Sequence, residues 1–191
     1  MASINGISVK SVTKFLGHER ETLFQGSLSL NGKKLGFWTQ DGWGGPDNFD
    51  LDRQFSERLL NEAVKKLNTD KAREVGPADG RFLFEYDLEL LLYDFIVLWQ
   101  DEKEFKKAVK AGYGGIVVAT DGYHVTTWKI PKSYAEMTNE TLLKVMEGLI
   151  EKAKKDFFAE SDECNKHIVK IYRSLDDFNI GEPIRLEDIM V

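Results

Sequence analysis

The stretch LFQGSLSLNGKKLGFW, residues 23–38, determines the fold class. Two strand-like runs, residues 23–30 and 34–38, flank the pair Asn31-Gly32. Both central residues of a type I′ turn need a positive φ, which asparagine and glycine tolerate best, so this pair predicts a tight hairpin. A two-residue turn forces its strands to run antiparallel. The stretch therefore predicts an antiparallel sheet.

A second hairpin is predicted towards the C-terminus. Residues 116–120 form a continuous apolar run, which is typical of a central strand. Residues 123–130 follow after Asp121-Gly122, another turn-forming pair. On the other side of the first hairpin, residues 4–15 alternate between apolar and polar positions and predict one more strand. The sequence thus predicts about five strands built from hairpins.

Apolar residues recur at helical spacing in four further segments. The predicted helices cover residues 55–67, 86–111, 138–157 and 161–175. Asp50 or Asp52 is the expected N-cap of the first helix, and Thr138 that of the third, because their side chains accept hydrogen bonds from free amides of the first turn. Residues 69–81 are expected to form a loop. The tail, residues 176–191, has weak periodicity, so we expect it to be loosely ordered.

Hairpins and helices come in groups along the chain, which is typical of an α+β fold. The length of 191 residues fits one domain. We therefore predict a single α+β domain spanning residues 1–191, in which an antiparallel sheet of about five strands packs against about four helices.

The charge balance narrows the function classes. The chain has 32 acidic and 26 basic residues and a formal net charge of −6. Proteins that grip a phosphate backbone usually present a strong basic patch, so direct binding to nucleic acid is disfavoured. An acidic chain instead favours contact with a basic protein surface.

The sequence also predicts the cellular location of the protein. Cys164 is the one cysteine, so an internal disulfide or a cysteine-based zinc site is excluded. Residues 1–10 lack the basic start and apolar run of a signal peptide. The most apolar stretch, residues 82–99, contains four acids, which are costly inside a bilayer. We expect a cytoplasmic protein without a membrane partner.

The candidate site is the loop TQDGWGGPDNFD, residues 39–50, together with the strand before it. Its glycines leave few neighbours to cover the aromatic side chains, and aromatic anchors on a rigid loop are typical of binding hot spots. The alternative is that these rings fold back into the core. The predicted partner-binding residues are Trp38, Trp43, Phe49, Asp41 and Asp47.

A metal site is the main chemical alternative at this loop. Clustered carboxylates suit magnesium or calcium, which prefer oxygen ligands. The aspartates are Asp41, Asp47, Asp50 and Asp52, and His18 is a candidate general base. The spacing after Asp41 does not fit an EF-hand loop, and aspartates commonly form turns and helix caps. No acid–base pair or activated nucleophile is assembled in the sequence, so we predict no catalytic residue, no cofactor and no metal.

Residues 15–46 carry a resemblance. With a Gly-His-Glu at 17–19, a Gln-Gly at 25–26, an Asn-Gly-Lys-Lys turn at 31–34 and a glycine-rich aspartate loop, this stretch resembles small accessory proteins of phages and mobile elements of gut-type Firmicutes. Such proteins include anti-CRISPR proteins. The resemblance implies an inhibitor of host defence and assigns no role to a particular residue.

Three functional hypotheses follow. The leading one is a non-catalytic binding protein, a phage-type inhibitor that blocks a host defence enzyme or complex through protein–protein contact. Its partner would be a nucleic-acid-binding host protein, whose basic channel accepts an acidic domain. The second is a metal-dependent enzyme acting on phosphodiesters. The third is a structural protein that self-associates into a homo-oligomer through its helical C-terminal half.

Overall fold

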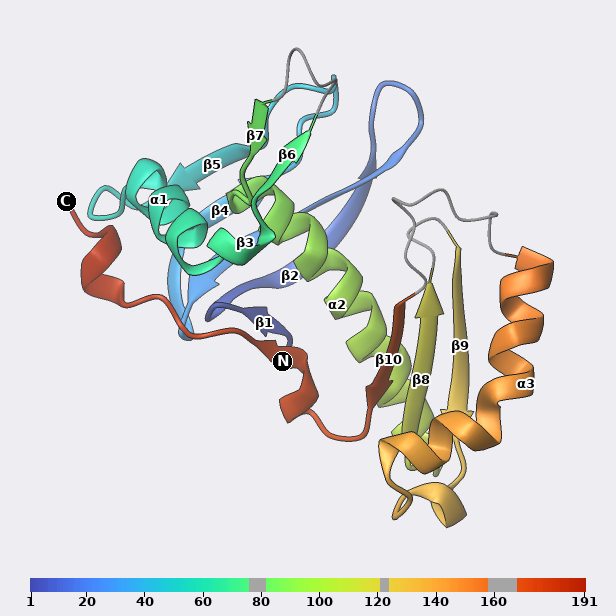
Figure 1. The fold of residues 1–191 in the computed structure, drawn as a ribbon. Coiled ribbons are helices and arrows are strands. Elements are labelled where there is room, and N and C mark those ends of the chain that lie inside the picture. Colours follow the sequence, from blue (N-terminus) through green and yellow to red (C-terminus); the bar gives the residue numbers. More distant parts are fainter. Residues whose placement is uncertain (76–81, 121–123, 158–167) are drawn as a thin grey trace. The chain divides into compact units, whose positions relative to one another are not determined.

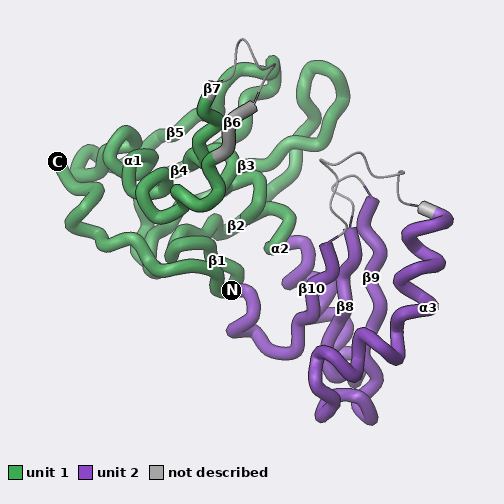
Figure 2. The backbone as a smooth tube through the Cα atoms, in the orientation of Figure 1, with its two compact units in different colours: residues 1–98, 179–191 green, residues 99–178 purple. Residues whose placement is uncertain are grey.

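The computed structural model is an α+β protein and describes residues 1–75, 82–120, 124–157 and 168–191. The chain divides into two compact units (Figure 2). Unit 1 consists of Met1–Leu98 and Asn179–Val191, and unit 2 of Trp99–Phe178. Unit 2 is therefore inserted into the sequence of unit 1. That the chain folds as one domain remains a prediction.

Unit 1 contains a six-stranded sheet of order β11-β1-β2-β3-β4-β5 (Figure 1). All neighbours are antiparallel except β1 and β11, which run parallel. The predicted hairpin is confirmed, with φ of 50° at Asn31 and 84° at Gly32. The strands are β1 (Ser3–Ile4), β2 (Ile7–Leu16), β3 (Thr22–Leu30), β4 (Lys33–Thr39), β5 (Asn48–Leu51) and β11 (Asn179–Ile180).

Gly36 allows β5 to approach β4 closely. A β-carbon at this position would meet the backbone of Asp50 and lie 2.6 Å from Cα of Leu51, which is too close for any side chain. Gly36 is paired with Leu51 in the sheet. The glycine thus fixes the position of β5 and, with it, the end of the preceding loop.

The helices of unit 1 follow the predicted pattern, with one wrong cap. Helix α1 (Glu57–Leu67) begins after Ser56, whose hydroxyl accepts a hydrogen bond of 3.3 Å from the amide of Leu59. The predicted caps were wrong because Asp50 lies within β5 and the amide of Asp52 bonds to Leu35 of the sheet. Helix α2 (Leu88–Lys110) confirms the long predicted helix and contributes to both units.

Two segments expected to be irregular are structured in part. Residues 69–81 were predicted as a loop, yet Thr69–Lys71 form a 3-10 turn and β6 (Arg73–Val75) pairs with β7 (Phe82–Phe84). Residues 76–81 of this segment lie outside the described residues. The tail was predicted to be loose, and it is fixed to unit 1. Ile184 and Ile189 are buried there, and the Asn31 side chain donates a hydrogen bond of 2.8 Å to the carbonyl of Ile184.

Unit 2 is built on a three-stranded antiparallel sheet of order β10-β8-β9. The predicted central strand is confirmed as β8 (Gly115–Thr120), which pairs with β9 (Val125–Ile130); the Asp121-Gly122 turn lies outside the described residues. Helix α3 (Asn139–Phe157) begins after Thr138, whose hydroxyl accepts a hydrogen bond from the amide of Thr141, as predicted.

The predicted last helix, residues 161–175, was wrong where the structure describes it. Ile168–Tyr172 form strand β10, which completes the sheet on the other side of β8. The β-branched residues of this segment favour a strand. The pairing with β8 also favours a strand, because it gives this central strand its second neighbour. Cys164 lies outside the described residues.

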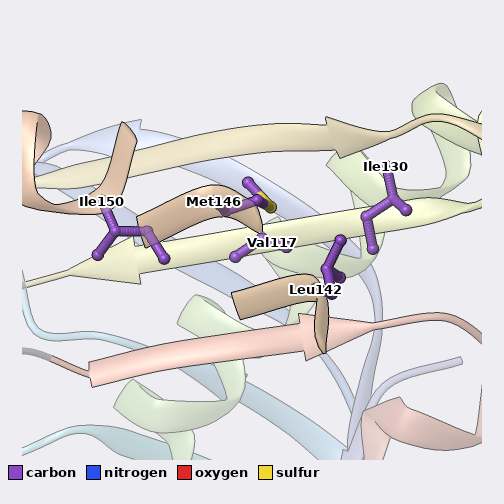
Figure 3. Close-up of a cluster of buried hydrophobic side chains, with 5 residues drawn as sticks. All are labelled: Val117, Ile130, Leu142, Met146 and Ile150. Carbon is purple, nitrogen blue, oxygen red and sulfur yellow. The ribbon is translucent and has the colours of Figure 1, made fainter. Parts of the chain in front are cut away.

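Helix α3 covers one face of this sheet. Figure 3 shows the buried cluster between them, which consists of Val117, Ile130, Leu142, Met146 and Ile150. Trp128, Val169 and Ile171 pack against this cluster from the sheet. Ala119 of β8 packs against Ala153 of α3 on the same face, whereas Ile116 and Val118 point to the opposite face and are also buried.

The α+β class is confirmed, whereas the predicted single sheet was wrong. The two predicted hairpins belong to different sheets, and the described residues form sheets of six, three and two strands with three α-helices. In the described part of the chain, no helix is long and apolar enough to cross a membrane.

Candidate functional site

Two loops of unit 1 meet at one end of the six-stranded sheet (Figure 1). Residues 17–21 connect β2 to β3, and residues 40–47 connect β4 to β5. In a meander of antiparallel strands, alternate connections lie at the same end. The amide of His18 donates a hydrogen bond of 2.8 Å to the carbonyl of Gly42, which joins the two loops. We call residues 17–21 and 40–47 the loop platform.

Trp43 and His18 form an exposed stacked pair on the loop platform. Their ring centroids are 4.2 Å apart and their planes differ by 24°. Trp43 is 78% exposed, so the prediction that its ring faces outward is confirmed. Aromatic pairs of this kind contribute about 0.5–1.5 kcal/mol beyond buried area. The imidazole thus holds the indole in one direction while most of the indole surface stays accessible.

Asp41 organises the backbone around this tryptophan. Its Oδ2 accepts hydrogen bonds from the amides of Trp43, at 3.2 Å, and of Gly45, at 2.6 Å. A carboxylate that bonds nearby amides is a common way of fixing a turn. The role of Asp41 in this geometry is therefore to rigidify the loop, while its contact with a partner remains a prediction.

Trp38 lies on the inside of the sheet, not on the surface. It is completely buried, so the expectation of an exposed ring was wrong at this position. In a strand, successive side chains point to opposite faces, and the parity of β4 places Trp38 with the buried Gly36 rather than with the exposed Phe37. Phe49 is the strand partner of Trp38 and is partly buried.

Asp47 links the loop platform to the sheet and to helix α2. Its Oδ2 accepts a hydrogen bond of 2.7 Å from Nε1 of Trp38, and its amide donates one of 3.0 Å to Oε1 of Glu89 at the start of α2. Burial raises the pKa of the Asp47 carboxyl from 3.8 to about 6. The Trp38 hydrogen bond opposes this rise in pKa, and the negative charges of Glu89, Asp87 and Asp41 add to it.

The platform is strongly acidic. Its two loops contain a single basic residue, Arg20, against four carboxylates, Glu19, Glu21, Asp41 and Asp47. The negative charges of Asp87 and Glu89 lie close enough to raise the pKa of Asp47. This excess of negative charge attracts cationic groups and repels phosphates.

Two residues of this region were missed by sequence reasoning. Leu16, at the end of β2, is 71% exposed next to the loop platform. Glu89 was interpreted only as part of a helix. The alternation of side chains along β2 could have indicated that Leu16 is exposed. The contact of Glu89 with Asp47 joins positions 42 residues apart, and no sequence pattern indicates it.

The residues named for the alternative of a metal site have separate roles in the structure. Asp41 bonds loop amides, Asp47 bonds Trp38, Asp50 lies in β5, and His18 stacks on Trp43. Among the residues that the structure describes, no group of three or more histidine, cysteine, aspartate or glutamate side chains is placed to hold a metal ion.

Comparisons with protein-family models, with curated proteins and with solved structures found no match for this chain. The inference of function therefore depends on the geometry and charge of the loop platform.

Proposed function

We propose that this protein is a non-catalytic binding protein that docks on a basic protein surface through the loop platform. One observation carries the proposal: Trp43 is 78% exposed and yet fixed, by the stack with His18 and by the Asp41 hydrogen bonds. Exposing a large apolar ring costs free energy in water. Holding it rigid before binding lowers the entropy lost on association, as in many hot spots.

The surroundings of Trp43 favour a cationic partner. Exposed Leu16 adds apolar area, and the carboxylates of the platform supply a negative rim. A hydrophobic anchor within a charged rim is the usual anatomy of a specific protein interface. Charge complementarity would speed association, and high salt would weaken binding because it screens the charges.

We further propose a nucleic-acid-binding host protein, such as a defence enzyme, as the first partner to test. The resemblance of residues 15–46 to accessory proteins of phages motivates this choice, and so does the acidic platform, because a channel that binds nucleic acid is basic.

The test is capture of a partner with matched variants. Tagged wild-type chain would be exposed to a host lysate, and the captured protein would then be purified and titrated by calorimetry. Trp43→Ala should weaken its affinity by at least about thirtyfold, as expected for a hot spot. Tyr93→Ala, which removes another exposed aromatic ring of unit 1, should change the affinity less than about threefold.

Two further measurements separate the proposed site from a loss of structure. The melting temperature of Trp43→Ala should stay near that of the wild type, because the ring is mostly exposed. Affinity should also fall as salt rises. A partner that binds Trp43→Ala and the wild type equally well would overturn the proposal.

A further inference from the structure

The open edge of β9 is the first of two features of unit 2 that point to a second copy of this chain. In the described part of the chain, β9 pairs with β8 alone and forms one edge of the three-stranded sheet. Its six residues pair with β8 without a register shift. A regular edge strand presents unpaired amide and carbonyl groups and is a template for another strand.

The second feature is an uncovered flank of helix α3. Leu142, Met146 and Ile150 face the sheet and are buried. Val145 and Leu149 lie on one side of this row, and each is 52% exposed. They are four residues apart and therefore adjacent on the helix surface. Leu143, on the other side of the row, packs against the buried cluster.

The edge and the flank adjoin each other. Trp128 of β9 packs against the cluster beneath α3. Figure 3 shows Leu142 on the β10 side of β8 and Met146 on its β9 side, so the helix crosses towards β9. In Figure 1, α3 begins near the lower ends of β8 and β10, and its later turns run alongside β9.

We propose that unit 2 pairs with unit 2 of a second copy, strand β9 against β9 and helix α3 against α3. A two-fold axis through Thr127 would continue the sheet from three strands to six. It would also bring the Val145 and Leu149 side chains of both copies together. An interface of this kind uses the same surface twice and closes on itself as a dimer.

The charges of β9 suit pairing with itself. Lys129 is the one charged residue of the strand. In an antiparallel pair centred on Thr127, Lys129 lies opposite Val125 of the second copy, and Thr127 opposite Thr127. Like charges therefore never face each other across the axis. Val125, at 58% exposed, and the exposed Lys129 both point to the face opposite α3, where such cross-strand contacts form.

The charges of α3 also suit an antiparallel neighbour. The first half of the helix carries Glu140, Lys144 and Glu147, a net charge of −1, and its second half carries a net charge of +1, from Glu151, Lys152, Lys154, Lys155 and Asp156. A two-fold axis reverses the second helix, so the basic end of one copy lies beside the acidic beginning of the other. A parallel neighbour would instead place like charges side by side.

The test is the mass of the full chain by light scattering and sedimentation over a wide range of concentration. We expect a species of twice the chain mass of 21.8 kDa as the concentration rises. Leu149→Glu should raise the dissociation constant at least about tenfold. Leu83→Glu, at an exposed leucine of unit 1, and Trp43→Ala should leave it unchanged.

A charge pair at β9 tests the register. Val125→Lys would place a second cation opposite Lys129 and weaken the dimer, whereas Val125→Glu would place an anion there and strengthen it. Both variants change the same exposed position, so a difference of about tenfold between them reports the contact and not the fold. A strict monomer at every concentration, or a dimer indifferent to Leu149→Glu and to both Val125 variants, would overturn the proposal.

Discussion

The indole Nε1 of Trp38 donates a hydrogen bond of 2.7 Å to Oδ2 of Asp47, and this contact ties the buried face of the sheet to the loop platform. Trp38 is completely buried, whereas Asp47 is only partly so. The carboxyl therefore loses much of its hydration but gains a single strong donor.

Asp47 should make stability depend on pH. Because its pKa rises from 3.8 to about 6 on folding, only the folded chain holds the proton between these values. Stability from this group is thus fully present below the lower value and is lost as pH rises through the upper one. One pKa unit corresponds to about 1.4 kcal/mol, and partial exposure reduces the effect, so we expect a loss of about 1–2 kcal/mol.

The measurement is denaturant unfolding of Asp47→Asn and wild type at several pH values across this window. The asparagine still accepts the Trp38 hydrogen bond but carries no charge, so the variant should gain stability relative to wild type as pH rises. Asp50→Asn, at an exposed aspartate of β5, is the control and should follow the wild type. Parallel curves for all three proteins would contradict the prediction.

Two tryptophans should differ sharply in their effect on stability. Trp38→Ala removes a fully buried ring and should lower the free energy of unfolding by about 3–5 kcal/mol. Trp43→Ala removes a ring that is 78% exposed and should lower it by less than about 1 kcal/mol. Urea unfolding monitored by circular dichroism compares them. Equal losses would mean that the outer ring is part of the core.

The buried pair Tyr172 and Asp101 should stabilise unit 2. The Tyr172 hydroxyl donates a hydrogen bond of 2.9 Å to Oδ2 of Asp101. Burial raises the pKa of Asp101, and this hydrogen bond opposes the rise. Tyr172→Phe removes the donor and should cost about 1–3 kcal/mol.

The cost of Tyr172→Phe should grow with pH, because without the donor the buried carboxylate is harder to ionise. The check is unfolding of this variant and of the wild type at two pH values, one acidic and one mildly alkaline. Asp101→Asn in the same background should reduce the difference between the two conditions. A cost independent of pH would show that Asp101 does not depend on this hydrogen bond.

The C-terminal tail should be part of the core of unit 1. Ile184 is 2% exposed, and its amide donates a hydrogen bond to the carbonyl of Asn5. Ile184→Ala should therefore cost about 2–5 kcal/mol. Ile180→Ala, at a residue that is 42% exposed, is the matched control and should cost less than about 1 kcal/mol. Thermal unfolding measures both, and similar melting temperatures would show that the tail is not needed.

Local signals in the sequence predicted the elements that depend on neighbours along the chain. The Asn31-Gly32 turn, helix α2 and the cap at Thr138 are all confirmed. Each depends on backbone preferences or on hydrogen bonds within a few residues, which the sequence displays directly. The exposure of Trp43, within its run of glycines, is a feature of the same kind.

What the sequence by itself determined is therefore the α+β class, the hairpins and an acidic, glycine-rich loop. The tertiary structure alone decided that the hairpins belong to separate sheets and that Ile168–Tyr172 form a strand beside β8. It also decided that Trp38 is buried and donates a hydrogen bond to Asp47. These features depend on contacts between distant residues. Their stability comes from burial and pairing that no local pattern specifies, and such contacts routinely override local propensity.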